Sequence, residues 1–117
     1  MAGPNLRRSA RLLRRRHQHP RPLRHLHEGG ATLLYHGDFD WGGLRIASVL
    51  LRCVPWRPWR YTAADYRAAA LARPDGPALA GHPAEAPWDP DLRQALLQLA
   101  VRVEEETVLD VLLSDLA

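Results

Sequence analysis

The sequence predicts an α/β fold: a parallel sheet with flanking helices and a helical segment at its C-terminal end. Three observations predict it. Residues 31–39 contain the run Thr-Leu-Leu-Tyr-His, which is apolar on both faces, as is typical of an interior strand of a parallel sheet. Residues 41–53 then carry apolar side chains at helical spacing. A short strand at 59–61 and a helix over 62–71 repeat the order strand–helix, which is typical of parallel α/β units.

The N-terminal 27 residues differ from the rest in charge. They hold eight Arg and no Asp or Glu, whereas residues 28–117 hold eight Arg and thirteen acids. We expect a basic, poorly ordered arm over 1–27, with a basic helix over 6–16, because few large apolar side chains are present to order it. Residues 23–28 predict a short turn of helix, and Gly29-Gly30 predict its left-handed cap. The folded domain is expected over 28–117.

The elements after residue 31 follow from apolar spacing and from end signals. The stripe of the 41–53 helix is predicted to consist of Leu44, Ile46, Ala47, Leu50 and Leu51. Thr62 and Asp65 have the spacing of a capping box, and residues 73–88, rich in proline, predict a loop. Asp89-Pro90 predicts a helix start. The apolar residues that follow predict one long helix, or two joined ones, to the C-terminus: Leu92, Leu96, Leu99, Val103, Leu109, Leu112 and Leu116.

Composition narrows the class of protein. No apolar run is long enough to span a membrane, and Cys53 stands alone, so we expect a cytoplasmic protein without disulfides. All 16 basic residues are Arg. A basic arm on an acidic body is typical of nucleic-acid binding. The complete absence of Lys is also explained by a GC-rich coding sequence, and we favour that explanation over nucleic-acid binding.

The strongest chemical signal is the pair Asp38 and Asp40. Residues at i and i+2 of a strand point to the same face, so both carboxylates are expected at the C-terminal end of the 31–39 strand. Two hard oxygen donors side by side suit Mg²⁺ or Mn²⁺. The structural alternative is that Asp38 is a loop residue and Asp40 is the N-cap of the following helix.

Neighbouring residues supply weaker candidates for contact with a phosphate backbone. Gly42 and Gly43 would allow close approach, Arg45 lies one turn into the helix, and His36 precedes the pair. Each also has a structural interpretation, as turn glycines, a surface Arg and a packed His. The run 104–106 is predicted to be a solvated helix face, with a smaller chance that Glu104 or Glu105 reaches the metal site.

The block His36–Ala47, with sequence HGDFDWGGLRIA, resembles an uncharacterised bacterial family with a Toprim-type C-terminal domain. That family resembles the nuclease subunit of Wadjet plasmid-defence systems and, more distantly, the topoisomerase VI A subunit. The similarity continues through residues 58–60, 63–66, 86–92, 104–105 and 108–116. The resemblance implies a Toprim-like, Rossmann-like sheet. It also implies a Mg²⁺-dependent DNA-cleaving activity in which Asp38 and Asp40 are catalytic metal ligands.

Toprim domains also use a Glu at the end of an earlier strand, and this chain has no counterpart of it. We therefore expect the chain to correspond to the C-terminal part of a larger, N-terminally truncated protein. Its first 27 residues could be a frame-shifted reading. Two hypotheses follow for function: a fragment of a DNA-cleaving defence protein that is inactive alone, or a non-catalytic remnant or interaction module.

Overall fold

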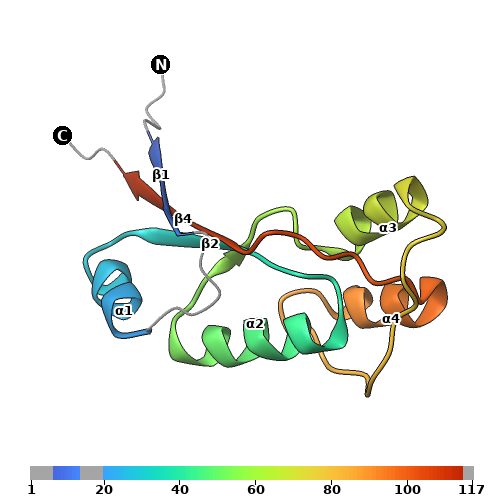
Figure 1. Ribbon diagram of the computed structural model, residues 1–117. Helices are drawn as coiled ribbons and strands as arrows, with labels where there is room; N and C mark the ends of the chain where they lie inside the picture. Colours follow the sequence, from blue (N-terminus) through green and yellow to red (C-terminus); the bar gives the residue numbers. More distant parts are fainter. Residues whose placement is uncertain (1–6, 14–19, 115–117) are drawn as a thin grey trace.

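The computed structural model describes residues 7–13 and 20–114, and side chains from residue 24 to residue 109. It is a mixed α/β fold (Figure 1), which confirms the predicted class. The strands form one sheet in the order β1 (Arg7–Leu13), β4 (Val108–Ser114), β2 (Thr32–His36) and β3 (Arg57–Pro58). The helices are α1 (Pro20–Glu28), α2 (Trp41–Cys53), α3 (Ala63–Ala72) and α4 (Pro90–Leu99).

Strands β2 and β3 are parallel neighbours joined by α2, as the sequence predicts. Leu34 lies opposite Arg57, and the Trp59 N–H donates to the Tyr35 carbonyl at 2.9 Å. The strand predicted at 59–61 lies instead at 57–58. Arg60 has a φ of 53°, in the left-handed region, so the chain leaves the extended conformation before Tyr61.

The N-terminal part differs from its prediction. Residues 7–13 form β1, antiparallel to β4, so the basic helix predicted over 6–16 is wrong for these residues. The remaining residues predicted for that helix, 6 and 14–16, lie outside the described ones. Helix propensity is overridden here because β4 pairs with six of these seven residues, with a register shift between Arg11 and Leu13.

Helix α1 ends as predicted, at glycines. Gly30 has a φ of 99°, and the Ala31 N–H donates to the Leu26 carbonyl at 3.1 Å while the Gly30 N–H donates to the His27 carbonyl at 2.9 Å. These two bonds are those of a Schellman cap. The helix itself begins at Pro20, and Pro22 lies in its first turn, where a missing N–H removes no helical bond.

The C-terminal prediction is corrected. Helix α4 stops at Leu99, where Ala100 adopts a left-handed φ of 54°, and Val108–Ser114 is a strand rather than the end of a long helix. Apolar residues three and four apart suggested a helix, but β4 pairs antiparallel with β2 and with β1. The sheet is therefore mixed, with one parallel pair.

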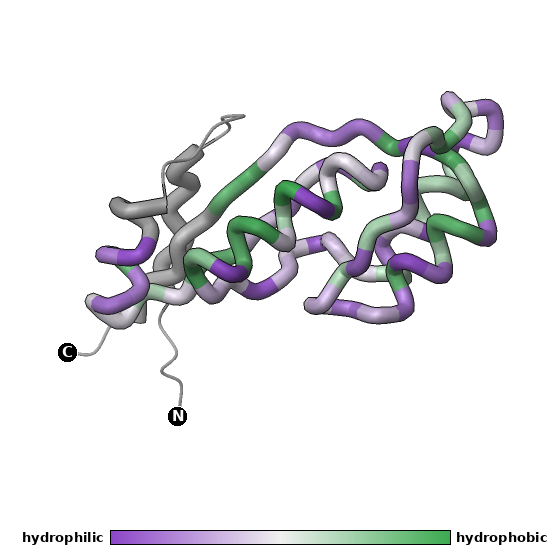
Figure 2. The backbone as a smooth tube through the Cα atoms, turned by 90° about the horizontal axis from the view of Figure 1, so that it is seen from below, coloured by the Kyte–Doolittle hydropathy of each residue, from purple (hydrophilic) through white to green (hydrophobic). Residues whose placement is uncertain are grey.

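Helix α2 has the predicted bounds but a narrower buried side. Leu44 and Ala47 are fully buried, whereas Ile46, which was predicted to lie in the stripe, is 61% exposed. Ile46 lies two residues from Leu44, a separation of about 200° around a helix, and therefore lies away from the core. Figure 2 shows hydrophobic and hydrophilic residues alternating along this helix, as expected for one with a single buried side.

The core beside the helices is largely aromatic. Tyr61 and Trp88 stack at 5.1 Å between ring centroids, and Phe39 lies 5.1 Å from Tyr61 and 5.3 Å from Tyr66. The predicted caps of α3 and α4, a capping box at Thr62 and a Pro after Asp89, are both formed. In Figure 1, α3 and α4 lie beyond the end of the sheet, on the side to which β2 and β3 run.

This aromatic core predicts loss of stability in alkali. Burial raises the pKa of Tyr35 to about 12. Burial also raises the pKa of Tyr61 well above its ordinary 10.0. Between about pH 10 and 12 the unfolded chain loses the Tyr35 proton while the folded chain keeps it, so stability falls as pH rises. The free energy of unfolding, measured with urea, should fall by about 2 kcal/mol less between these two pH values in Tyr35→Phe than in the wild-type chain. The figure follows from ~1.4 kcal/mol for each unit by which the pKa is raised. An unchanged slope would contradict this.

Candidate functional site

Three connections meet where β2 and β3 end. The first links β2 to α2 (residues 37–40), the second links β3 to α3 (59–62), and the third links α4 to β4 (100–107). Phe39 and Val103 form an antiparallel bridge, with the Phe39 N–H donating to the Val103 carbonyl at 2.9 Å. This bridge brings residues 104 and 105 beside the Asp38–Asp40 pair.

Asp38 is fixed from two other connections. Its Oδ1 accepts a hydrogen bond from the Glu105 backbone N–H at 2.6 Å. Its backbone carbonyl accepts one from the Tyr61 hydroxyl at 2.7 Å. The strand predicted over 31–39 is shorter, because β2 ends at His36. Asp38 is therefore a half-buried loop residue two positions beyond the strand, which is the structural alternative weighed for it from the sequence. The carboxylate therefore has a defined position at the carboxyl edge of the sheet.

Asp40 is the N-cap of α2, the structural role weighed for it from the sequence. Its Oδ1 accepts from the Gly43 N–H at 2.6 Å. A Cβ placed on Gly43 would overlap the Asp38 carbonyl oxygen and would lie 3.0 Å from both the Asp38 Cβ and the Asp40 Oδ1. Gly43 therefore lies against both residues, next to the backbone and Cβ of Asp38 and the carboxylate of Asp40.

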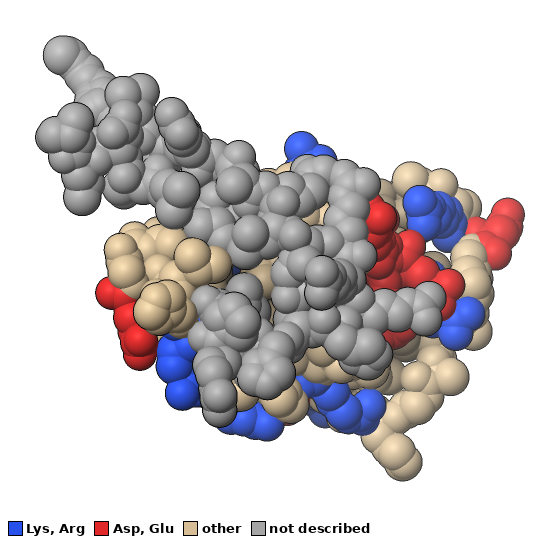
Figure 3. Space-filling model, turned by 60° about the vertical axis from the view of Figure 1, so that its left-hand side comes forward, with Lys and Arg blue, Asp and Glu red and all other residues tan. Residues whose placement is uncertain are grey.

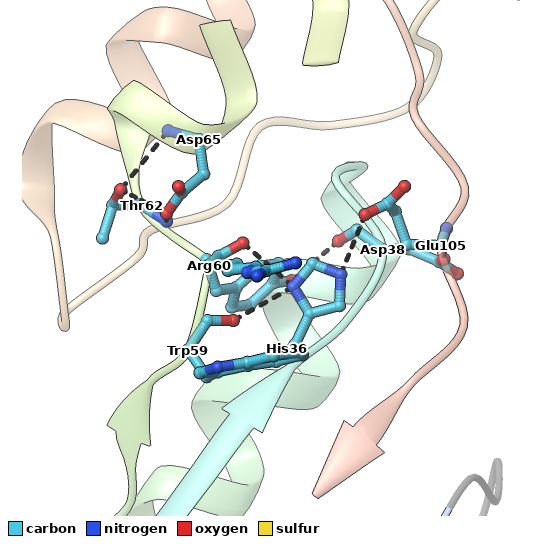
Figure 4. Close-up of polar contacts among 8 residues, drawn as sticks. His36, Asp38, Trp59, Arg60, Thr62, Asp65 and Glu105 are labelled. Atoms are coloured by element: carbon cyan, nitrogen blue, oxygen red, sulfur yellow. Dashed lines mark hydrogen bonds and ion pairs between the residues drawn. The ribbon is translucent and has the colours of Figure 1, made fainter. Parts of the chain in front are cut away.

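His36 connects the three segments. Its Nδ1 lies 3.1 Å from the Trp59 carbonyl and 2.9 Å from the Arg60 carbonyl, and its Nε2 lies 3.0 Å from Glu105 Oε1. The ring is buried and faces acceptors at both nitrogens. Figure 4 shows Trp59 and Arg60 on one side of His36, with Asp38 and Glu105 on the other. His36 therefore holds the β3–α3 connection against Glu105, whose N–H in turn holds Asp38.

The electrostatics of the site disfavour its negative charges. Burial raises the pKa of Asp38 above its usual value, and the charges of Asp40, Glu104 and Glu105 raise it further, while the Glu105 N–H opposes this rise. The Arg102 Nε lies 3.7 Å from the exposed Glu104 carboxylate, and an ion pair with an exposed partner contributes little. Figure 3 shows acidic side chains gathered on one part of the face it draws. A bound cation would relieve this repulsion.

The other predicted residues lie in different surroundings. Arg45 is exposed, and its guanidinium donates to the His82 carbonyl in the 73–88 loop. Gly42 is exposed in the first turn of α2. The predicted solvated helix face at 104–106 is wrong, because these residues lie in the α4–β4 connection. Glu105 was predicted on a solvated helix, with only a small chance of reaching the site. The alternation of Val101 and Val103 with polar residues was the available signal for extended chain there.

The comparisons with known proteins give one family. A family model, DUF2399, described as the C-terminus of proteins of unknown function, matches residues 16–116. The chain belongs to the DUF2399 family. The match includes all three connections of the site. It begins at residue 16, twelve residues before the domain start predicted from composition. No curated protein and no solved structure matches this DUF2399 chain significantly. No described helix is long and apolar enough to cross a membrane.

The donor chemistry of the DUF2399 site fits a hard divalent cation only in part. Asp38 and Asp40 each use Oδ1 in a protein hydrogen bond, so within the described part of the chain Oδ2 of each remains for a cation. Among residues 24–109, however, no group of three or more His, Cys, Asp or Glu side chains has an arrangement that could hold a metal ion. Two carboxylates therefore leave most of an octahedral Mg²⁺ shell to water or to other ligands.

Proposed function

We propose that this chain supplies two carboxylate ligands, Asp38 and Asp40, to a Mg²⁺-dependent centre that cleaves DNA phosphodiesters, and that the chain alone is inactive. The observation that carries the proposal is the packing of Gly43 against both aspartates at the carboxyl edge of the sheet, against the backbone and Cβ of Asp38 and the Oδ1 of Asp40. The pKa of Asp38, which is raised first by burial and then by the charges of Asp40, Glu104 and Glu105, supports it, since a bound cation would stabilise the ionised form of a buried carboxylate with acidic neighbours. The resemblance of residues 36–47 to Toprim-type nucleases of plasmid defence gives the substrate class.

Each residue has a distinct part in this proposal. Asp38 and Asp40 would hold the ion through their Oδ2 atoms, and the bound ion would supply Lewis-acid polarisation of a phosphoryl oxygen. The Glu105 N–H and the Tyr61 hydroxyl fix Asp38, and the Gly43 N–H fixes Asp40. His36 orients Glu105 rather than contacting substrate. Further ligands would come from outside the described residues, in agreement with the family's description as a C-terminal region.

The test is plasmid nicking with Mg²⁺ or Mn²⁺. We expect the purified chain to leave supercoiled plasmid intact, because its described residues offer an incomplete ligand set. We expect a longer member of the DUF2399 family to nick it, and to lose at least ~100-fold in rate when the aspartates matching Asp38 and Asp40 become Asn. An exposed loop residue, matching Asp75, provides the control substitution to Asn.

Two results would contradict the proposal. Nicking by the longer protein that survives both aspartate substitutions would remove the aspartates from the reaction and favour a non-catalytic interaction module. Robust nicking by this chain, abolished by Asp38→Asn, would show that the ligand set is complete within residues 1–117. Glu104 and Glu105 would then be the first candidates for the missing ligand, because both are close enough to raise the pKa of Asp38.

A further inference from the structure

Arg60 is the feature of the site that neither the sequence nor the proposed centre explains. It has a φ of 53°, a conformation that non-glycine residues adopt rarely and that often occurs at functional sites. Its carbonyl accepts from His36 Nδ1 at 2.9 Å, so the peptide is held on the acidic site. The unusual backbone is thus fixed by the same His36 that orients Glu105.

The Arg60 side chain is both exposed and organised. Its guanidinium carbon lies 4.9 Å from the centroid of the Trp59 ring. Stacking on an aromatic face leaves the N–H donors of a guanidinium free at its edge, and it restricts the rotamers of a long side chain before any ligand binds. No described carboxylate pairs with this guanidinium, in contrast to Arg93, which lies 3.3 Å from Glu85. Arg60 therefore presents an unpaired donor fork at the edge of the site.

We propose that Arg60, stacked on Trp59, is a phosphate-binding residue that holds the DNA backbone beside the Asp38–Asp40 pair. This inference rests on the proposed function, because it takes the substrate phosphodiester to be the ligand. A planar fork of donors matches two phosphate oxygens, and Arg is the side chain best suited to this bidentate contact. The sequence had suggested Arg45 for this phosphate contact, but the Arg45 guanidinium already donates a hydrogen bond to the His82 carbonyl.

The test is binding of a fluorescein-labelled single-stranded DNA decamer to the full chain, measured by fluorescence anisotropy with Mn²⁺ present. We expect Arg60→Gln to weaken binding about tenfold and to lower the salt dependence by about one counterion. Arg60→Gly is the second variant, because glycine adopts the positive φ without strain and keeps the backbone in place. The control is Arg57→Gln, which removes an exposed Arg three residues away in β3 and should change affinity less than about twofold.

The outcomes separate this inference from the proposed function. Equal losses in Arg57→Gln and Arg60→Gln would show a non-specific charge effect and would overturn the role of Arg60. Unchanged affinity in both Arg60→Gln and Arg60→Gly would overturn it as well. In either case, Mn²⁺ binding measured on the same samples would still support the proposed metal centre at Asp38 and Asp40. If the wild-type chain binds no Mn²⁺, the proposed function fails instead, and this inference fails with it.

Discussion

Gly43→Ala is expected to destabilise the chain by about 3 kcal/mol, the combined effect of overpacking and a lost helix cap. The added Cβ would overlap the Asp38 carbonyl oxygen, which is fixed backbone, and would lie 3.0 Å from the Asp40 carboxylate that caps α2. Relief requires α2 to move away from the end of β2, which separates the two aspartates. Urea unfolding followed by circular dichroism measures the loss.

Gly42→Ala is the matched control for this change. Its Cβ would meet only Asp40 Oδ1, at 3.7 Å, an ordinary contact. Because alanine is the better helix former, we expect Gly42→Ala to raise stability by up to about 1 kcal/mol. Equal effects of the two substitutions, in either direction, would show that the close approach at Gly43 does not constrain the site.

His36→Leu is expected to cost about 3 kcal/mol, although leucine is apolar and similar in size. The substitution leaves the Trp59 and Arg60 carbonyls and the Glu105 carboxylate without their shared partner. When partly buried acceptors lose their hydrogen-bond donor, the folded state is destabilised by about 1–3 kcal/mol. The loss is measured by urea unfolding at pH 7.

Glu105→Gln tests the contact between His36 and Glu105 separately from the contacts of His36 with the Trp59 and Arg60 carbonyls. Its amide oxygen still accepts from a His36 ring N–H, and its backbone N–H still donates to Asp38. We therefore expect a loss of only about 1 kcal/mol, the difference between a charge-assisted and a neutral hydrogen bond. A loss in Glu105→Gln as large as that in His36→Leu would mean that the ion pair, rather than the two carbonyl bonds, holds the connection.

Local patterns predicted those parts of the fold that local interactions determine. The bounds of α2, the capping box at Thr62, the start of α4 after Asp89 and the glycine cap of α1 all follow from neighbouring residues. The N-cap role of Asp40, weighed from the sequence as an alternative, is local in the same way, whereas the strand predicted up to residue 39 ends at His36 and leaves Asp38 in the loop. Such features depend on interactions within about one helical turn, which the sequence displays directly.

Non-local pairing determined the parts that were missed. Residues 7–13 and 108–114 are strands because they pair with each other and because 108–114 also pairs with β2, and no local signal reports such partners. Because residues 108–114 were predicted to be helical, Glu105 was predicted on a helix face, whereas it lies in the α4–β4 connection. The network of His36, Glu105 and Asp38 joins residues up to 69 positions apart in sequence, and only the folded chain brings them together.

The most direct test of the account is Mn²⁺ binding to the purified chain, followed by the electron paramagnetic resonance signal of the free ion. Two carboxylates with water in the remaining positions predict a single weak site, with a dissociation constant on the order of 1 mM. Asp38→Asn and Asp40→Asn should each abolish saturable binding, while Asp75→Asn should leave it unchanged. Absence of saturable binding to the wild-type chain, or binding that persists in both aspartate variants, would contradict the assignment of Asp38 and Asp40 as metal ligands.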